Sequence, residues 1–298
     1  MSVVAPEQEP SWIIEPKLSP RRRIRNGIAT TWMIGSVLVA LVPLVLIFGY
    51  VVKKGLAIVD WKFLTSDIPI LTRAPGGGMY PAIVGTIVIT FWATAMAVPL
   101  GVLAAIYLHE YGGSRHLPAV IRFMADVMTG VPSIVMGLFI YTIWVLKHGL
   151  TGFAGSLALG ALMLPIIIRS TEEMLRLVPD DLRRASDALG ARRWRTTLTV
   201  VLPAALPGIV SGVMLAIARA AGETAPLLFT IGASRKVNWD AFHGVNTALP
   251  LQIFRNAQQP FPAAVDRAWG AAFTLIVIVF VCTVAARLVS TRFASRTQ

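Results

Sequence analysis

The sequence predicts an all-α membrane protein with six transmembrane helices, because its composition, its apolar stretches and its charge distribution agree on that class. Hydrophobic residues make up 55% of the chain, charged residues only 14%, and the mean hydropathy is +0.69. About a quarter of the residues of a soluble chain are charged, so the composition argues against a soluble domain. The single cysteine, Cys282, lies in an apolar run, which excludes a disulfide framework and a thiolate metal cluster.

Six stretches are apolar enough to cross a bilayer as helices, each of which needs about 20 largely apolar residues. They are roughly 28–52, 80–108, 124–146, 153–169, 205–229 and 268–289. The fourth stretch is short, and the fifth contains charged residues.

The distribution of basic residues predicts the orientation of the chain. Segments on the side of the two termini hold 17 of the 27 Lys and Arg residues, the opposite side holds 9, and Arg219 lies inside the fifth stretch. Because cytoplasmic loops are enriched in Lys and Arg, both termini are predicted to be cytoplasmic. The same sorting explains the net charge of +12 without nucleic acid as a partner.

One membrane domain is therefore expected over residues 27–290, and the protein is expected in the cytoplasmic membrane. A disordered cytoplasmic tail, 1–26, precedes it, and a short cytoplasmic tail, 291–298, follows it.

The internal segment 170–204 is predicted to contain two short helices. Pro179 precedes two aspartates, a pattern that begins helices, and Gly190 interrupts the helical spacing before a second basic piece that contains Trp194. The first piece carries an apolar stripe made of Leu182, Ala185 and Leu189. Such a hairpin could transmit a rigid-body push from a soluble partner, or it could rest on anionic lipid headgroups. Composition favours neither interpretation.

The stretch IARAAGETAPLL (217–228) raises the question of why a spanning segment keeps two charges. Each charge costs about 2.5–3.5 kcal/mol at the bilayer centre, so Arg219 and Glu223 need a use there. Spaced four residues apart on one helix face, they can pair with each other. Pro226 leaves the carbonyl of Gly222 without a donor, which predicts a kink, and Thr224 can meet part of that demand.

Two roles for this pair remain open. The pair could simply close the helix bundle, or it could lie on a transport path, where the planar fork of an arginine suits an oxyanion. In the second case the glutamate would neutralise the arginine until an anion arrives, or accept a hydrogen bond from a protonated oxyanion.

A break at the start of the third stretch adds a weaker candidate. The sequence Gly130, Pro132, Ser133 could direct backbone N–H groups towards an anion, with a plain helix kink as the alternative. The four histidines show no ligand spacing, so no metal site is expected. The chain has no GxxxxGK[ST] motif, so it is not expected to hydrolyse ATP by that route.

Longer motifs resemble a known family. The run ASDALGARRWRTTLTVVLPAALPGI resembles the EAA loop of binding-protein-dependent ABC importer permeases, in which this loop forms the coupling helices that dock on the ATPase subunits. The motifs RAAGETAPLLF, TGVPSIVMGLF, GMYPAIVGTI and ALPLQIF resemble the phosphate-import permeases of that family, PstA, over about 79–285. One departure is Arg184, which stands where the family usually has glutamate.

The resemblance implies a type I ABC importer permease fold that moves inorganic phosphate inward by alternating access. The implied substrate-path residues are Arg219, Glu223, Thr224 and Ser133. The implied coupling residues are Arg184, Ala185, Ser186, Leu189, Gly190 and Trp194. The implied partners are a PstC-like permease, two PstB-like ATPase subunits that bind ATP and Mg, and an external PstS-like phosphate-binding protein. This chain itself should bind no cofactor. Alternatives are a permease for sulfate or molybdate, and an anion channel or carrier that works without an ATPase.

Overall fold

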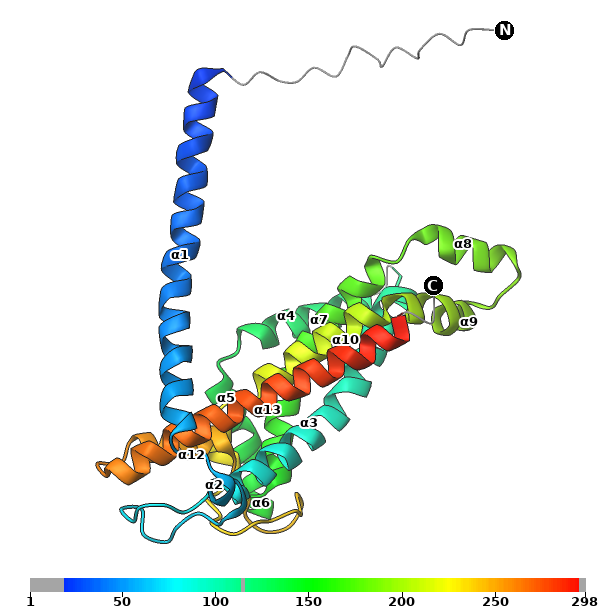
Figure 1. Cartoon of the computed structure of the whole chain (residues 1–298). Helices are drawn as coiled ribbons and strands as arrows, with labels where there is room; N and C mark the ends of the chain where they lie inside the picture. Colours follow the sequence, from blue (N-terminus) through cyan, green and yellow to red (C-terminus); the bar gives the residue numbers. More distant parts are fainter. Residues whose placement is uncertain (1–18, 114–115, 295–298) are drawn as a thin grey trace, which may run out of the picture. The chain divides into compact units, whose positions relative to one another are not determined.

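The computed structural model describes residues 19–113 and 116–294 (Figure 1). The chain divides into two compact units, Met1–Tyr50 and Val51–Gln298. The outer parts of both predicted tails, 1–18 and 295–298, lie outside the described residues. Helix α1 begins at Pro20, so helical structure starts earlier than the predicted tail boundary at residue 26.

The described residues form helices and turns, with no strand among them. The α-helices are α1 (Pro20–Leu56), α2 (Trp61–Thr65), α3 (Tyr80–Ile106), α4 (His116–Gly130), α5 (Ser133–Ile140), α6 (Leu146–His148), α7 (Gly152–Arg176), α8 (Asp180–Ala188), α9 (Arg193–Thr196), α10 (Leu202–Ala221), α11 (Leu227–Thr230), α12 (Leu249–Ala257) and α13 (Pro262–Ala294). Three π-helical turns join some of them: η1 (Tyr107–Tyr111), η2 (Tyr141–Val145) and η3 (Thr197–Val201).

By length and composition, five helices of the described chain can cross a membrane, and a sixth span results if a bent pair is counted as one. The six-span prediction is confirmed on that count. The third span is not one straight helix, however, because α4 and α5 meet at 106° across the break before Ser133. The predicted break at Gly130 and Pro132 accounts for the bend, since proline cannot continue the hydrogen-bond ladder of α4.

The fourth span is longer than expected. Helix α7 runs from Gly152 to Arg176 and takes up the first residues of the predicted internal loop. Its start is capped by Thr151, whose hydroxyl accepts the N–H of Ala154 at 3.2 Å. Its charged end continues as helix because buried ion pairs hold it, as described below.

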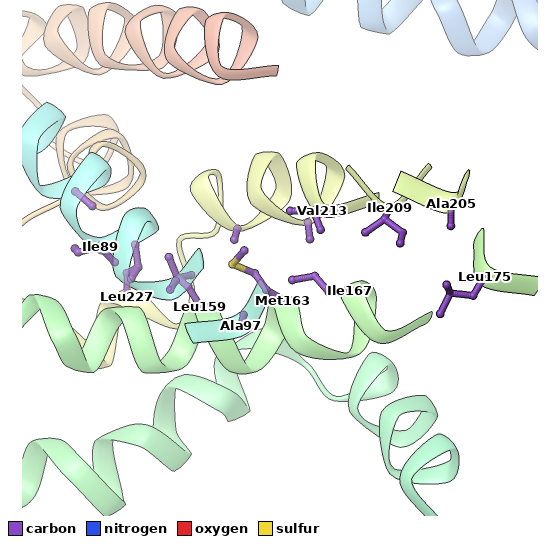
Figure 2. Packing of buried hydrophobic residues seen from close by; sticks show 14 of the residues in the cluster. Ile89, Ala97, Leu159, Met163, Ile167, Leu175, Ala205, Ile209, Val213 and Leu227 are labelled. Atoms are coloured by element: carbon purple, nitrogen blue, oxygen red, sulfur yellow. The ribbon is translucent and has the colours of Figure 1, made fainter. Parts of the chain in front are cut away.

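Helix α7 is the centre of the second unit, with α3 on one side and α10 on another. Figure 2 shows Leu159, Met163 and Ile167 of α7 among buried side chains of the neighbouring helices, and all three are at most 1% exposed. Lipid tails are as apolar as these side chains, so close packing of small residues has to hold the helices together. On α10, Gly208 and Gly212 face Met174 and Ser170 of α7 so closely that a Cβ atom would clash.

The α3–α7 contact is also a close approach at glycine residues, and it includes a hydrogen bond between the helices. A Cβ at Gly101 of α3 would meet Ile167 at 2.7 Å, and a Cβ at Gly160 of α7 would lie 3.5 Å from the carbonyl oxygen of Ala93. The buried hydroxyl of Ser156 donates to the carbonyl of Ile89 across the interface at 3.0 Å. These helices therefore form one rigid group.

Two long connections, 57–79 and 231–248, lie at one end of this unit, which we call the loop end. Asn246, 1% exposed, fastens the second connection, because its Oδ1 accepts the N–H of Gly152 at 3.0 Å. Further out, Asp240 accepts the backbone N–H of Phe242 and pairs with the His243 ring, and these contacts keep the pKa of the Asp240 carboxyl below its usual value. The opposite end carries α8 and α9 and is called the hairpin end (Figure 1).

Candidate functional site

Arg219 and Glu223 form the predicted ion pair. The Arg219 Nε lies 3.6 Å from the Glu223 Oε1, which is an ion-pair distance but slightly too long for a hydrogen bond. The side chain of Arg219 is 68% exposed and that of Glu223 is 21% exposed. The carboxylate is thus held against the protein, while most of the guanidinium remains open.

The helix that carries this pair is shorter than predicted. The fifth span was expected to continue to residue 229, but α10 ends at Ala221, and Glu223 lies in the turn that follows. Gly222 ends the helix and Pro226, without an N–H, prevents its immediate continuation. The expectation of a kinked helix with both charges on one face is therefore wrong, although the charges still meet.

The turn after α10 leads into α11, which is firmly buried. Thr224 accepts the backbone N–H groups of Leu227 and Leu228 with its carbonyl oxygen, at 3.1 and 3.3 Å. Leu227 is 2% exposed, and a Cβ on Gly137 of α5 would come within 2.6 Å of the Pro226 Cα. Because α11 and α5 pack this closely, the turn that holds Glu223 is fixed in place.

Ser133 makes no contact with the pair in the described structure. It is the first residue of α5, one helical turn before Gly137, and is only partly exposed. Within the described residues, no hydrogen bond connects the Ser133 side chain to Arg219 or Glu223. The structure therefore brings together Arg219 and Glu223 out of the four predicted path residues, with Thr224 in the same turn.

The depth of the pair follows from its neighbours on α7. Leu162, Met163 and Ile166, in the middle of α7, line a small hollow together with Arg219 and Glu223. The hollow has a volume of only ≈ 10 Å³, about the minimum for one water molecule. This hollow, as the described residues form it, is therefore too small for a larger anion.

At the hairpin end, the α8–α9 hairpin (residues 177–196) has the two helices predicted from the sequence. Gly190 has a φ of +76°, a left-handed conformation that glycine adopts readily and side chains disfavour. The Ser186 and Thr196 hydroxyls lie 2.9 Å apart and link the two helices. The hairpin is a defined element, not a random loop.

The hairpin exposes several large apolar side chains. Leu189 is 89% exposed, Leu182 is 43% exposed, and Trp194 on the second helix is 55% exposed. Ala185 of the predicted stripe is exposed as well, and so is Arg184. Exposed large apolar side chains clustered on one element are typical of a protein or membrane contact.

An arginine that the sequence did not single out fastens the hairpin to the bundle. Arg183 is 17% exposed and donates to the carbonyls of Val178 and Leu175 at 2.7 and 2.9 Å. It also pairs with Glu110 of η1 at 3.0 Å and with Asp180 at 3.1 Å. The hairpin is thereby linked to the end of α3. In the sequence, Arg183 stands among several arginines with no feature that distinguishes it.

A second network holds α4 to the charged end of α7. The Arg122 Nε donates to the buried Glu172 carboxylate at 2.7 Å, and its NH2 donates to the Leu108 carbonyl at 2.8 Å. Arg169 pairs with Asp126 and lies 3.7 Å from Glu172. This network explains why α7 stays helical beyond residue 169. No sequence pattern indicated this network, because Glu172 fell in a predicted loop.

Residues 19–113 and 116–294 contain no group of three or more His, Cys, Asp or Glu side chains with metal-site geometry. The expectation that the chain holds no metal or cofactor of its own remains a prediction.

Residues 97–298 match the model of a family described as "Binding-protein-dependent transport system inner membrane component". The chain is 45% identical to "Phosphate transport system permease protein PstA 1" of Mycobacterium tuberculosis (strain ATCC 25618 / H37Rv), over 98% of this chain and 97% of the relative. It is 47% identical to the PstA protein of Mycobacterium leprae over 88% of this chain and 87% of the relative. The PstA protein of Yersinia pestis is 41% identical, with 90% of each chain covered.

Solved structures with a similar fold include inward-facing conformations of the MetNI methionine ABC transporter. The match has a TM-score of 0.56 at 18% identity and covers 72% of this chain and 94% of the matched chain. A bacterial ABC transporter involved in the import of alginate matches with a TM-score of 0.57 at 14% identity, over 91% and 99% of the two chains. At these identities the likeness concerns the fold alone, and it is the fold of ABC importer permeases.

Proposed function

The chain belongs to the PstA family of phosphate transport permeases, and from this premise we propose that it forms part of the membrane path through which an ATP-driven importer moves inorganic phosphate by alternating access. It is a multi-pass membrane protein and a transport component. We propose that ATP hydrolysis takes place on partner subunits. A permease of an ABC importer works with ATPase and substrate-binding partners. Here we propose two PstB-like ATPases that bind ATP and Mg, a homologous PstC-like permease and an external PstS-like binding protein.

The exposure of Arg219 is the observation that carries the path assignment. A guanidinium that is 68% exposed at the level of the middle of α7 would cost several kcal/mol if it faced lipid tails. The face of α10 that bears it therefore suits an aqueous path or the partner permease. An arginine fork can bind two phosphate oxygens at once, and Glu223 can neutralise it when no anion is present.

The small hollow at the pair supports a shared path. Because ≈ 10 Å³ cannot hold phosphate, we propose that a second permease subunit provides the remaining wall. Thr224 fixes the turn that carries the glutamate, and Ser133 begins the helix packed against that turn. We assign both to the surroundings of the path.

We propose that the exposed face of the α8–α9 hairpin is the ATPase contact, and that the hairpin end and both termini are cytoplasmic. Leu182, Leu189 and Trp194 provide apolar contact area, and Arg183 ties the hairpin to α3 so that a push on it reaches the bundle. The Lys and Arg bias supports the same orientation.

Uptake of radiolabelled phosphate by proteoliposomes that contain the full complex and its binding protein tests this function. We expect ATP-dependent uptake that a tenfold excess of sulfate or molybdate does not reduce. Uptake without ATP would indicate a channel or carrier, and competition by sulfate or molybdate would indicate a different oxyanion; either result would overturn the proposal.

A further inference from the structure

The loop end contains a cavity in which three arginines converge. It has a volume of ≈ 170 Å³ and lies between the loop before α3, residues 233–235, α12 and the start of α13. Its polar lining consists of Thr72, Arg235, Arg255, Arg267, Gln252, Asn256 and Gln259. The lining includes no Asp or Glu, so its charge is entirely positive.

Arg267 is the buried member of this group. It is 3% exposed and donates to the carbonyls of Ala74 and Gly76 at 2.7 and 3.1 Å, and to that of Thr72. Its Nε has no hydrogen-bond partner in the described structure, and no carboxylate there lies within ion-pair distance of it. Carbonyl groups accept from its Nη1 and Nη2 donors but leave the positive charge in place. A buried charge without an ion-pair partner is costly, and an anion in the cavity would reduce that cost.

Helix α12 contributes polar groups that the chain already holds in position. Gln252 and Asn256 are each 6% exposed. The Gln252 amide donates to the Thr247 hydroxyl at 2.9 Å and accepts from the Asn256 amide at 3.4 Å. Arg255, on the same helix, is half-buried and has no ion pair among the described residues. The helix therefore presents fixed hydrogen-bonding groups in the same cavity as guanidinium groups that have no ion-pair partner among the described residues.

Three of the four basic residues of the segment 230–267 line this one cavity, and only Lys236 stands outside it. Positive-inside sorting disfavours basic residues on the external side, so their convergence there calls for a specific reason. Guanidinium groups bind oxyanions by paired charge-assisted hydrogen bonds. Pockets for drug-sized ligands typically have about 300–1,000 Å³, so ≈ 170 Å³ suits a small inorganic anion better.

We propose that this cavity is an oxyanion site that holds inorganic phosphate at the external mouth of the permease before the ion reaches Arg219. The inference rests on the proposed function, since it takes the loop end to be external and phosphate to be the transported ion. The same chemistry could serve a carboxylate of a docked binding protein or a lipid phosphate, and the experiment separates these sources.

Equilibrium binding of radiolabelled phosphate to the transporter complex in phosphatidylcholine nanodiscs, without binding protein, tests the site. All samples carry Arg219→Gln, so that binding reports the cavity and not the path. The Arg235→Gln/Arg255→Gln double variant should raise the Kd at least about tenfold. Lys236→Gln, a matched loss of an adjacent external charge, should leave the Kd unchanged. Arg267 is kept because it holds the loop before α3.

Three outcomes would overturn the inference. The first is an equal Kd in the double variant and the Lys236 control. The second is intact phosphate binding with weakened docking of the loaded binding protein, which would assign the arginines to a protein carboxylate. The third is loss of phosphate binding when phosphatidylglycerol is added, which would assign the cavity to lipid.

Two further measurements keep these results interpretable. Arg255→Lys keeps the charge but loses the fork, so an intermediate Kd is expected even if the double variant assembles poorly. Uptake by the wild-type complex is measured in parallel. If it takes up no phosphate while the cavity binds it, the proposed function fails and only the assignment of a phosphate-binding site to this cavity stands.

Discussion

Replacing Arg219 with glutamine separates a transport role from a purely structural one, because the two roles predict different losses. Glutamine keeps much of the length and the hydrogen-bonding capacity of the side chain while removing its charge. Lysine at the same position restores the charge without the planar fork.

The structural part of the loss should be small. The charged atoms lie 3.6 Å apart without a hydrogen bond, and the arginine side chain is 68% exposed. Two unit charges at about 4 Å attract by roughly 1 kcal/mol in water and roughly 4 kcal/mol at an effective dielectric constant of 20. After desolvation and side-chain entropy, such open pairs contribute about 0–1 kcal/mol. Breaking a fully buried pair would instead cost about 3–5 kcal/mol.

The assay is phosphate uptake normalised to the amount of assembled complex. Arg219→Gln should assemble like wild type, and its uptake should fall at least about a hundredfold, which corresponds to roughly 2.7 kcal/mol of lost stabilisation along the path. Lysine should rescue only part of the uptake, whereas Glu223→Gln should keep some transport. Ser211→Ala, another exposed position on α10, serves as the matched control and should behave like wild type.

A double variant gives the result that would refute this reasoning. If Arg219→Leu/Glu223→Leu assembles normally and transports at the wild-type rate, the pair has no role in the path. A complex that is lost in both single variants and restored in the double variant would show that the pair is structural.

Three other predictions concern the hairpin end and the orientation. Gly190→Val should lower co-purification of the ATPase and its stimulated activity severalfold, because valine disfavours a φ of +76°. Gly190→Asn should have a milder effect on both measurements. Equal losses in the two variants would contradict this explanation. Arg183→Gln and Glu110→Gln should each reduce the coupling of ATP hydrolysis to phosphate uptake by a similar factor. The double variant should lose no more coupling than the more impaired single variant. Additive losses would exclude a shared contact. In a background without the native cysteine, Lys236→Cys should react with an impermeant thiol reagent from outside intact cells, and Leu189→Cys should not. Labelling of Leu189→Cys without labelling of Lys236→Cys would invert the topology.

The sequence was sufficient for the features that depend on local chemistry. Length and hydropathy predicted the spans, and a glycine between two helical patterns predicted the turn at Gly190. The approach of Arg219 and Glu223 followed from their spacing, even though the helix between them ends at Ala221. A four-residue separation keeps two side chains close in a helix and also in a tight turn that continues it.

The sequence was insufficient where a residue's role depends on a partner far along the chain. Glu172 looked like one more charge in a loop, and only the fold brings Arg122, 50 residues away, within 2.7 Å of it. The cavity arginines show the same limit, because Arg267 meets carbonyl groups more than 190 residues earlier. Carbonyl partners exist at every residue, so no side-chain pattern identifies them.

The two adjacent arginines of the hairpin show how a departure from a family pattern can be confined to one face. Arg183 points its guanidinium at Glu110 and two carbonyls, so it fixes where the hairpin sits on the bundle. Arg184 is exposed and has no ion pair among the described residues. The inward contacts that set the geometry therefore do not depend on residue 184. A positive charge there, in place of the glutamate expected from the family pattern, alters the outer face alone. We expect the compensation on the ATPase, as an acidic side chain opposite residue 184, and not inside this chain.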